Sequence, residues 1–248
     1  MTAREIRVIP LEGIPEIEDG DDLAGLLLDA AEQTGGFEDA DVLVVAQKAV
    51  SKAEGRVVRL DDVEPSQRAL ELADDRDPRH VEWILRESAH VVRVRPPLII
   101  AETRHGYVCA SAGVDASNAR GPGTLVLLPV DPDGSADRLR ATLRERAGRD
   151  VGVIVTDSFG RPWRQGTTDV AIGASGIEVM QELSGERDPI GYELKATVIA
   201  IADELAGAAQ LVAGKLDRVP VSIVRGLEVR GDGRATDIPI PPERDLFG

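Results

Sequence analysis

Short apolar segments divide this chain at irregular intervals, and they constrain its fold more than any other feature. Seven of them have the length and composition of buried strands, at residues 6–11, 41–47, 97–102, 107–111, 124–129, 151–156 and 220–226. Helical patterns occupy residues 21–33, 65–74, 78–89, 135–147 and 192–212, and Ser135 is the expected N-cap of the fourth. This order predicts a mixed α/β (α+β) fold, and its irregularity argues against a Rossmann repeat.

Composition limits the class of protein and its partners. The 248 residues are 42% hydrophobic, which is enough for a large core, and no flexible linker interrupts them, so we expect residues 1–248 to form a single unit. Aromatic residues make up only 3% and the net charge is −15, so nucleic acid is not an expected partner. Without a signal-peptide pattern or an apolar run of about 18 residues, we expect a cytoplasmic protein with no membrane contact. Cys109 is the sole cysteine, which predicts a small buried side chain rather than a disulfide or zinc site.

Acidic and hydroxyl side chains follow two of the predicted strands. The strand at residues 151–156 is expected to stop at Asp157 and Ser158, before a turn that carries Arg161 and Arg164. Asp115 follows another strand, among small residues that leave room for a ligand. Two carboxylates and a hydroxyl favour Mg²⁺ or Mn²⁺ over Zn²⁺, and the arginines suit phosphate or carboxylate groups. The alternatives are an Asx turn at Asp115 and surface ion pairs at the arginines.

Lysines are scarce, yet two of the four lie close together. Lys48 and Lys52 follow the strand at residues 41–47, and the glycine turn LEGIP at residues 11–15 offers backbone that could surround a nucleotide. A solvated helix face would also explain the two lysines. No Walker A or G-x-G-x-x-G pattern occurs, so a nucleotide site would be neither of the P-loop nor of the Rossmann kind. The three histidines, His80, His90 and His105, lack metal-ligand spacing and are expected to be structural, as is Trp83.

Longer motifs carry a resemblance to a known family. In chain order, the segments LEGIP, DVLVVAQKAVSKAEGR, CASAGVDASNA, LLPVDPDGSADRLR, VGVIVTDSFGRPWRQG, AIGASGI, DPIGYELKATV, IADELAGAAQLVAGK and VPVSIVRGL resemble the coenzyme F-420:L-glutamate ligases. The resemblance extends from about Ile6 to Gly226. It implies GTP-dependent joining of L-glutamate to the lactyl carboxyl of coenzyme F-420-0, with release of GDP and phosphate, and a second γ-linked glutamate could follow.

The same resemblance implies an assembly and cofactors. The expected fold is a family-specific two-lobed α/β arrangement that forms an intertwined homodimer. Two divalent cations, Mn²⁺ or Mg²⁺, are expected in each subunit, with K⁺ as a stimulant. Some bacterial relatives carry a nitroreductase-like domain after the ligase region; we expect none here, and the number of glutamates added stays open.

The family's functional positions transfer onto this chain one by one. Asp115 and Asp157 are expected to hold the first cation and to serve catalysis, and Ser158 is expected to hold the second. Arg161 and Arg164 are our candidates for binding the acceptor or the glutamate carboxylates, from location and charge alone. The residues expected to contact GTP are Leu11, Glu12, Gly13, Ile14, Gln47, Lys48, Lys52, Asn118, Gly214 and Lys215.

Two of these positions differ from the archaeal pattern. That pattern has serine-threonine in place of Gln47-Lys48, and it has a glutamate that helps to bind the second cation in place of Lys215. The second cation could therefore bind more weakly here, be held by Ser158 with water and phosphate oxygens, or be partly replaced by the lysine's charge. Two other classes of function remain: a metal-dependent nucleotide phosphohydrolase and a non-catalytic nucleotide-binding module.

Overall fold

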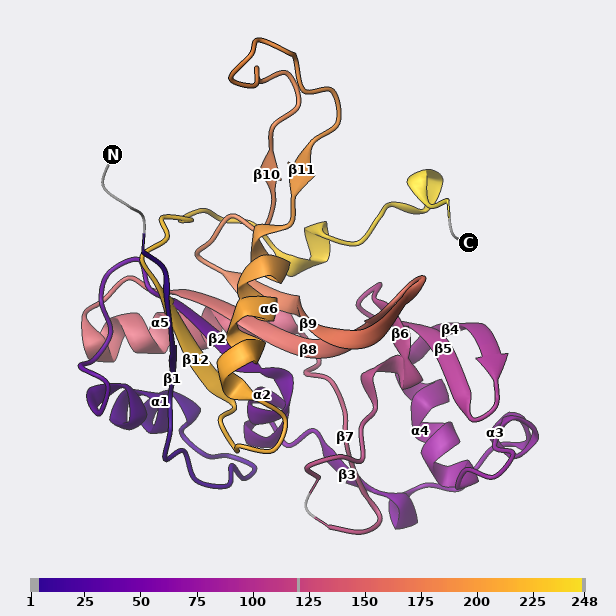
Figure 1. The fold of residues 1–248 in the computed structure, drawn as a ribbon. Coiled ribbons are helices and arrows are strands. Elements are labelled where there is room, and N and C mark those ends of the chain that lie inside the picture. The colour runs from indigo at the N-terminus through magenta and orange to yellow at the C-terminus, as the bar shows by residue number, and fades with distance from the viewer. Residues whose placement is uncertain (1–4, 120, 247–248) are drawn as a thin grey trace.

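A five-stranded sheet forms the centre of the protein in the computed structural model, which describes residues 5–119 and 121–246. Its strands are β1 (Arg7–Pro10), β2 (Val42–Ala46), β8 (Gly152–Arg161), β9 (Arg164–Ser175) and β12 (Val221–Arg225). They lie in the order β1-β12-β2-β8-β9 (Figure 1). Only β2 and β8 run parallel, and every other neighbouring pair is antiparallel. The expected α/β class is confirmed.

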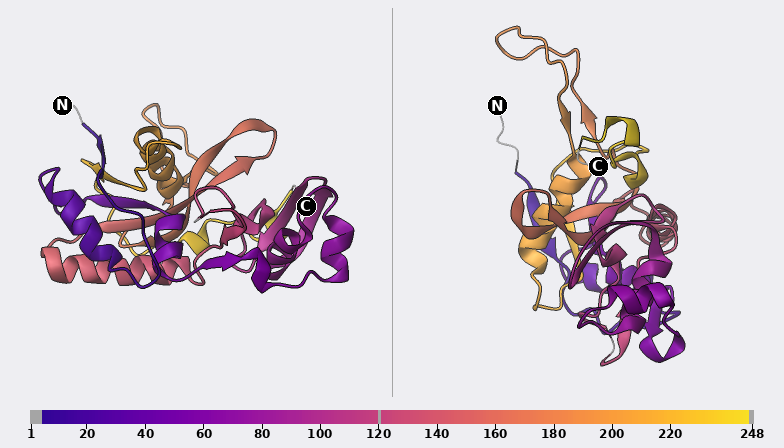
Figure 2. Two further views of the ribbon diagram at one scale, coloured as in Figure 1. Left: turned by 90° about the horizontal axis from the view of Figure 1, so that it is seen from below. Right: turned by 90° about the vertical axis from the view of Figure 1, so that its right-hand side faces the viewer.

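Helices cover both faces of this sheet, which explains why its central strands are apolar on both sides. Helices α1 (Leu23–Glu32) and α5 (Pro132–Ala147) pack on one face, where Leu27, Leu143 and Val153 belong to one core cluster. On the other face, α6 (Ile201–Ala213) packs against Val44 and Ile154 in a second cluster. The left view of Figure 2 shows the sheet between these two helix layers. None of the helices in the described residues combines the length and apolarity needed to cross a membrane.

The segment between β2 and α5 builds a separate group of elements beside the sheet (Figures 1 and 2). Helix α2 (Gln47–Ala53), directly after β2, still packs on the sheet, since Ala49 and Val50 belong to the first core cluster. The elements beside the sheet are β3 (Val57–Arg59), α3 (Gln67–Leu72), α4 (Pro78–Glu87), β4 (Ser88–Arg95), β5 (Leu98–Thr103), β6 (Val108–Ala110) and β7 (Thr124–Val126). Short 3₁₀ turns at Leu60–Asp62 and Ser111–Gly113 join them, and two more occur at Ala235–Asp237 and Pro242–Arg244. Ile84, Ile99 and Leu127 belong to a third core cluster, and Trp83 packs against it. Cys109 is buried, as predicted.

A two-stranded arm projects from the body where the sequence predicted the start of a helix (Figure 1). Strands β10 (Gln181–Glu182) and β11 (Val198–Ile199) pair antiparallel at its base. The helix predicted for residues 192–212 is therefore wrong at its beginning, because α6 starts only at Ile201. Backbone hydrogen bonds from Leu183 N–H to Thr197 O and from Leu194 N–H to Glu186 O hold residues 183–197 in the arm instead.

Two further boundaries differ from prediction for local reasons. Asp131, not Ser135, is the N-cap of α5: its carboxylate accepts the Gly134 N–H at 2.9 Å, and Pro132 occupies the first turn, where a fixed φ is favourable. Strand β8 does not stop at Thr156 but continues to Arg161, because it pairs with β9 in a long hairpin. Each of the seven predicted segments overlaps a strand; β3, β4, β9, β10 and β11 were not predicted.

A buried ion pair fastens β12 to the residues before β2, and it leads to our first prediction. Arg225 donates to both carboxylate oxygens of Asp41, each at 2.8 Å, and Asp41 is 1% exposed. Asp41→Ala should lower the free energy of unfolding by about 3–5 kcal/mol, since it leaves the Arg225 charge without its buried partner. Urea denaturation would measure this loss. Glu38→Ala, which removes an exposed partner of the same arginine, should cost less than about 1 kcal/mol, and equal losses for the two variants would contradict the assignment.

Candidate functional site

A cavity of about 800 Å³ opens where the parallel strands β2 and β8 stop pairing. Their last paired residues are Ala46 and Thr156. Gln47-Lys48, which begin α2, and Asp157-Ser158 of β8 come directly after these two residues. The carboxyl ends of parallel strands are the usual place for a ligand crevice, and the volume suits a small molecule. The sheet topology thus brings together two motifs that lie about 110 positions apart in the sequence.

Most of the predicted site residues line this cavity. They are Ile14, Gln47, Lys48, Lys52, Asn118, Asp157, Ser158, Gly214 and Lys215. Asp115 joins them through Lys48, whose ammonium lies 2.5 Å from its Oδ2. Leu11, by contrast, is fully buried in the core, and Glu12 and Gly13 are not part of the lining.

Asp115 is held by an unusual stretch of backbone. Ser111, Ala112 and Gly113 all have positive φ, and a Cβ on Gly113 would lie 2.7 Å from side-chain atoms of Leu128. The carboxylate then accepts the Ser117 N–H at 2.6 Å, so the Asx turn left open as an alternative is present. It leaves one carboxylate oxygen facing Lys48. The turn and the functional role are therefore compatible.

Lys48 and Asp115 form a tight polar cluster with Ser117. The Lys48 ammonium donates to the Asp115 carboxylate, to Ser117 Oγ at 2.8 Å and to Ser117 O at 2.9 Å. Burial alone would raise the pKa of Asp115, but the ammonium and the Ser117 donors outweigh burial and lower that pKa below its ordinary value. Asp115 is thus ionised at neutral pH.

Asp157 is the most perturbed acid of the site. Burial raises its pKa to about 7; the negative charges of Asp115 and Asp169 add to the effect, and Lys48 opposes it. The protein itself compensates the negative charge of such a carboxylate poorly. A bound cation would supply the missing positive charge. The Asp115 charge also contributes to the raised pKa of Asp157, so the two carboxylates lie close enough to interact.

The sequence prediction missed Asp169. This residue lies on β9 directly opposite Ser158, and its carboxylate accepts the Ser158 O–H at 2.6 Å. Burial raises the pKa of Asp169, and the Ser158 hydrogen bond and the charge of Lys215 oppose this only in part. The β-branched residues of TTDVAI could have indicated a strand at this place. Nothing in the sequence gave the register of that strand against β8.

Three of the four lysines in the chain line the cavity: Lys48, Lys52 and Lys215. Lys52 is 8% exposed and pairs with Glu16, so it does not lie on a solvated helix face. Gln47 is 1% exposed, and its Nε2 has no hydrogen-bond partner although its Oε1 accepts from Ser51. A buried amide donor without a partner is costly, and a polar ligand in the cavity would satisfy it.

Arg161 and Arg164 lie outside the cavity lining. They flank the turn between β8 and β9, both are exposed, and Arg161 donates to the Gln165 carbonyl at 3.3 Å. Within the described residues neither arginine forms an ion pair, so surface pairing does not explain them. The histidines also stay outside the lining: His90 pairs with Glu102, and His105 contacts the Val130 carbonyl.

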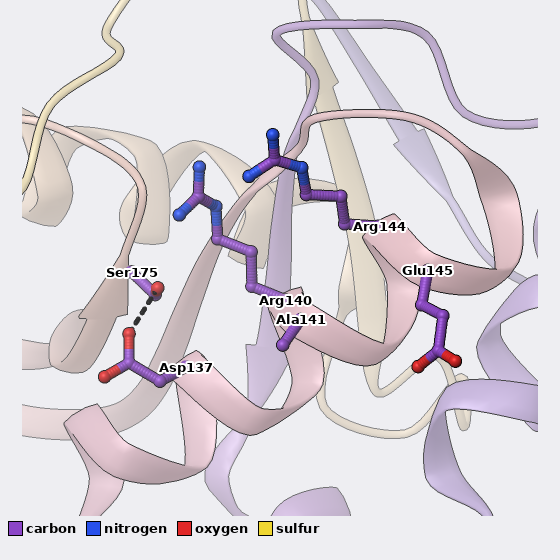
Figure 3. Close-up of a pocket in the computed structure, with 6 residues that line it drawn as sticks. All are labelled: Asp137, Arg140, Ala141, Arg144, Glu145 and Ser175. Carbon is purple, nitrogen blue, oxygen red and sulfur yellow. Dashed lines mark hydrogen bonds between the residues drawn. The ribbon is translucent and has the colours of Figure 1, made fainter.

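A second cavity, of about 460 Å³, lies against α5 and contains none of the predicted site residues. Figure 3 shows its lining, in which Asp137 accepts the Ser175 hydroxyl at 2.6 Å. Arg140 is tied to Val151 O and to Asp150, and Arg234 also binds Asp137. These side chains join α5 to β9 and the C-terminal segment. The larger cavity is therefore the candidate active site.

Comparison with known proteins assigns this chain to a family. The model described as F420-0:Gamma-glutamyl ligase matches residues 13–226. The chain belongs to this family. Relatives named coenzyme F420:L-glutamate ligase are 50% identical in Methanopyrus kandleri (98% of this chain and 96% of the relative) and 44% identical in Methanothermobacter thermautotrophicus (98% of each). The Archaeoglobus fulgidus relative is 43% identical over 98% of this chain and 96% of its own length. The chain is thus an enzyme, an acid–amino-acid ligase.

The donor set of this ligase fits a hard divalent cation. Asp115, Asp157 and Ser158 offer only oxygen atoms, which suit Mg²⁺ or Mn²⁺. In the part of the chain that the structure describes, however, no three His, Cys, Asp or Glu side chains are grouped closely enough to hold a metal ion alone. A cation here would need oxygens from a phosphate or from water as well, as Mg²⁺ commonly does.

Proposed function

We propose that the protein is a GTP-dependent ligase that joins L-glutamate to the lactyl carboxyl of coenzyme F-420-0. The observation that carries this proposal is the cavity at the ends of β2 and β8, which combines poorly compensated carboxylates with three lysines. This arrangement suits a polyphosphate chain together with its cations. The names of the relatives support the two other substrates.

A carboxylate is a poor acyl donor, so the lactyl carboxyl must be activated before an amine can attack it. Transfer of the γ-phosphoryl group of GTP to the lactyl carboxylate would give GDP and an acyl phosphate. The glutamate amine would then attack the carbonyl carbon, expel phosphate and lose a proton, which forms the amide. A divalent cation, Mn²⁺ or Mg²⁺, supplies neutralisation of the phosphate charge when it is bound. We also propose K⁺ as a stimulant and the addition of a further γ-linked glutamate as a later step.

The residues of the chain divide this work between them. Asp115, Asp157 and Ser158 would hold cations at the phosphates, and Lys52 and Lys215 would bind phosphate oxygens directly. Lys48 has a double role, because a cation at Asp115 must displace its ammonium. The released ammonium would then lie next to the same phosphates. The buried Nε2 of Gln47 would find its missing acceptor on the nucleotide.

A product assay tests the proposal. The full chain is incubated with GTP, Mn²⁺, L-glutamate and coenzyme F-420-0, and mass spectrometry should detect the acceptor enlarged by glutamate, with GDP formed in equal amount. Phosphate release that does not depend on the acceptor would instead favour a phosphohydrolase. Tight GTP binding without any turnover would favour a binding module.

The two arginines at the β8–β9 turn give a kinetic prediction. Arg161→Ala and Arg164→Ala should each raise the KM for the acceptor or for glutamate about 10-fold, because each removes a guanidinium that would bind a carboxylate or phosphate. The KM for GTP should not change, since neither side chain lines the cavity. Unchanged KM values for both acceptor and glutamate would remove the arginines from this role.

Assembly into the family's intertwined, two-lobed homodimer is also part of the proposal. The arm of residues 181–199 exposes Ile190, Tyr192 and Val198, which favours burial against a second copy of the chain. Sedimentation velocity should give the mass of a dimer. Ile190→Asp combined with Tyr192→Asp should shift the species to a monomer, whereas Leu246→Asp, at another exposed apolar position, should not. A wild-type chain that sediments as a monomer would refute this assembly.

A further inference from the structure

The turn between β8 and β9 holds a tryptophan in a backbone conformation that suits glycine. Pro162 and Trp163 form this two-residue turn, and Arg161 and Arg164 pair across it. The proline ring fixes its own φ at about −65°, and the φ of Trp163 is 55°. A proline followed by a residue with positive φ is the pattern of a type II turn, in which Gly or Asn normally takes the second position. The local geometry of the turn therefore does not explain the tryptophan.

The environment of the Trp163 side chain does not explain it either. Trp163 is 81% exposed, whereas Trp83, the other tryptophan of the chain, packs against the third core cluster. A large aromatic side chain stabilises a fold mainly through the area that it buries. A bulky residue held at positive φ also costs free energy, and such residues are concentrated at ligand-binding places. Both costs indicate that the indole serves binding and not the fold.

The turn and the cavity lie on the same hairpin. Ser158 lines the cavity, and three strand steps of about 3.3 Å lead from Ser158 to Arg161, so the turn begins roughly 10 Å from the cavity along β8. Figure 1 shows the paired ends of β8 and β9 extending beyond the other strands of the sheet. An elongated ligand whose reacting end lies in the cavity can therefore contact the turn with its other end.

We propose that Trp163 binds the deazaflavin ring of the acceptor by stacking, while the phospholactyl end of the acceptor extends along the hairpin to the cavity. This assignment rests on the proposed function, because it takes the acceptor to be coenzyme F-420-0. An indole face suits a flat aromatic ring, and the guanidinium groups of Arg161 and Arg164 beside it suit a phosphate. The net charge of −15 gives an anionic acceptor no general attraction, so these local contacts determine which acceptor binds.

Trp163→Gly tests the assignment, since it removes the indole and introduces the residue that the turn geometry favours. The fluorescence anisotropy of the deazaflavin reports its binding to the full chain, with GDP and Mn²⁺ present. The Kd for coenzyme F-420-0 should rise at least about 10-fold in Trp163→Gly. In Trp163→Phe, which keeps an aromatic face, the Kd should stay within about 3-fold of wild type. Far-UV circular dichroism and the melting temperature check that both variants are folded.

Two controls isolate the contact with the ring. The first is 2-phospholactate, which has the reacting end of the acceptor but no ring. It should compete with the coenzyme with the same affinity in wild type and in Trp163→Gly. The second is Asp74→Gly, at another exposed position with positive φ that lies outside the cavity lining. This variant should leave the Kd for the coenzyme unchanged.

An unchanged Kd in Trp163→Gly would overturn the assignment. Equal weakening of 2-phospholactate would also overturn it, because the substitution would then act on the whole site, and so would a lower sedimenting mass, which would place Trp163 in a subunit contact. The binding measurements need neither glutamate nor turnover. A chain that binds the coenzyme through Trp163 but forms no glutamyl product would refute the ligase function and leave the Trp163 site intact. Glutamyl product together with an unchanged Kd in Trp163→Gly would refute the Trp163 site alone.

Discussion

Asp157→Asn should lower kcat/KM for glutamyl transfer at least 100-fold while the protein stays folded. The substitution keeps the shape of the side chain but removes the charge that is least compensated by the protein, and with it the main attraction for a cation at the phosphates. A 100-fold loss corresponds to about 2.7 kcal/mol of transition-state stabilisation. Initial rates of glutamyl product formation at several Mn²⁺ concentrations would measure it.

Asp203→Asn is the control for this experiment. It also neutralises a buried acid close to β9, but its side chain can still accept the Ala171 N–H and does not reach the cavity. Its kcat/KM should remain within about 3-fold of wild type. If Asp157→Asn turns over at a near-normal rate when Mn²⁺ is limiting, Asp157 does not hold a catalytic cation.

The strands of the central sheet were predictable, because a strand buried on both faces needs a continuous apolar run. Residues 41–47 and 151–156 show such runs, and both became β2 and β8. Strand β9 was missed because half of it, Arg164 to Asp169, is polar or exposed and forms a strand only by pairing with β8. Local pattern alone cannot reveal that pairing.

The arm shows the opposite failure. Residues 192–200 carry no Gly or Pro, so they continue the helical pattern of α6 without interruption. Their β-branched residues Thr197, Val198 and Ile199 pair with residues on the other side of the Asp188–Gly191 turn, and this non-local pairing overrides helix propensity. The turn sequence DPIG was a better guide than periodicity.

For the site, the sequence identified residue types but not their partners. Asp157, Ser158 and Lys48 stood out because each follows an apolar run of sequence, and the parallel pairing of β2 and β8 then brings them together. The Lys48–Asp115 ion pair joins residues 67 positions apart, and the Ser158–Asp169 contact depends on hairpin register. Both contacts depend on how the strands and loops are arranged in the fold, and no sequence motif specifies that arrangement.

The same aspartate that is needed for activity should make the cation-free protein less stable as pH rises. The ordinary pKa of 3.8 applies when Asp157 is exposed in the unfolded chain, whereas burial raises its pKa to about 7 in the folded state. Between these values the folded state binds more protons than the unfolded state. The free energy of unfolding therefore falls as pH increases from about 4 to 7. Above pH 7 the whole destabilisation by the buried Asp157 charge is present.

Asp157→Asn removes this cost, so in the presence of a chelator the variant should be more stable than wild type at pH 8. The stability difference between the two proteins should grow by on the order of 2 kcal/mol from pH 5 to pH 8. Urea denaturation at both pH values would measure it, and Asp232→Asn, at an exposed position outside the cavity, should show no such growth. Lys48 keeps its Asp115 partner in the variant, so no cation is left unpaired. A pH-independent difference would mean that Asp157 is better solvated than its position between β8 and the cavity implies.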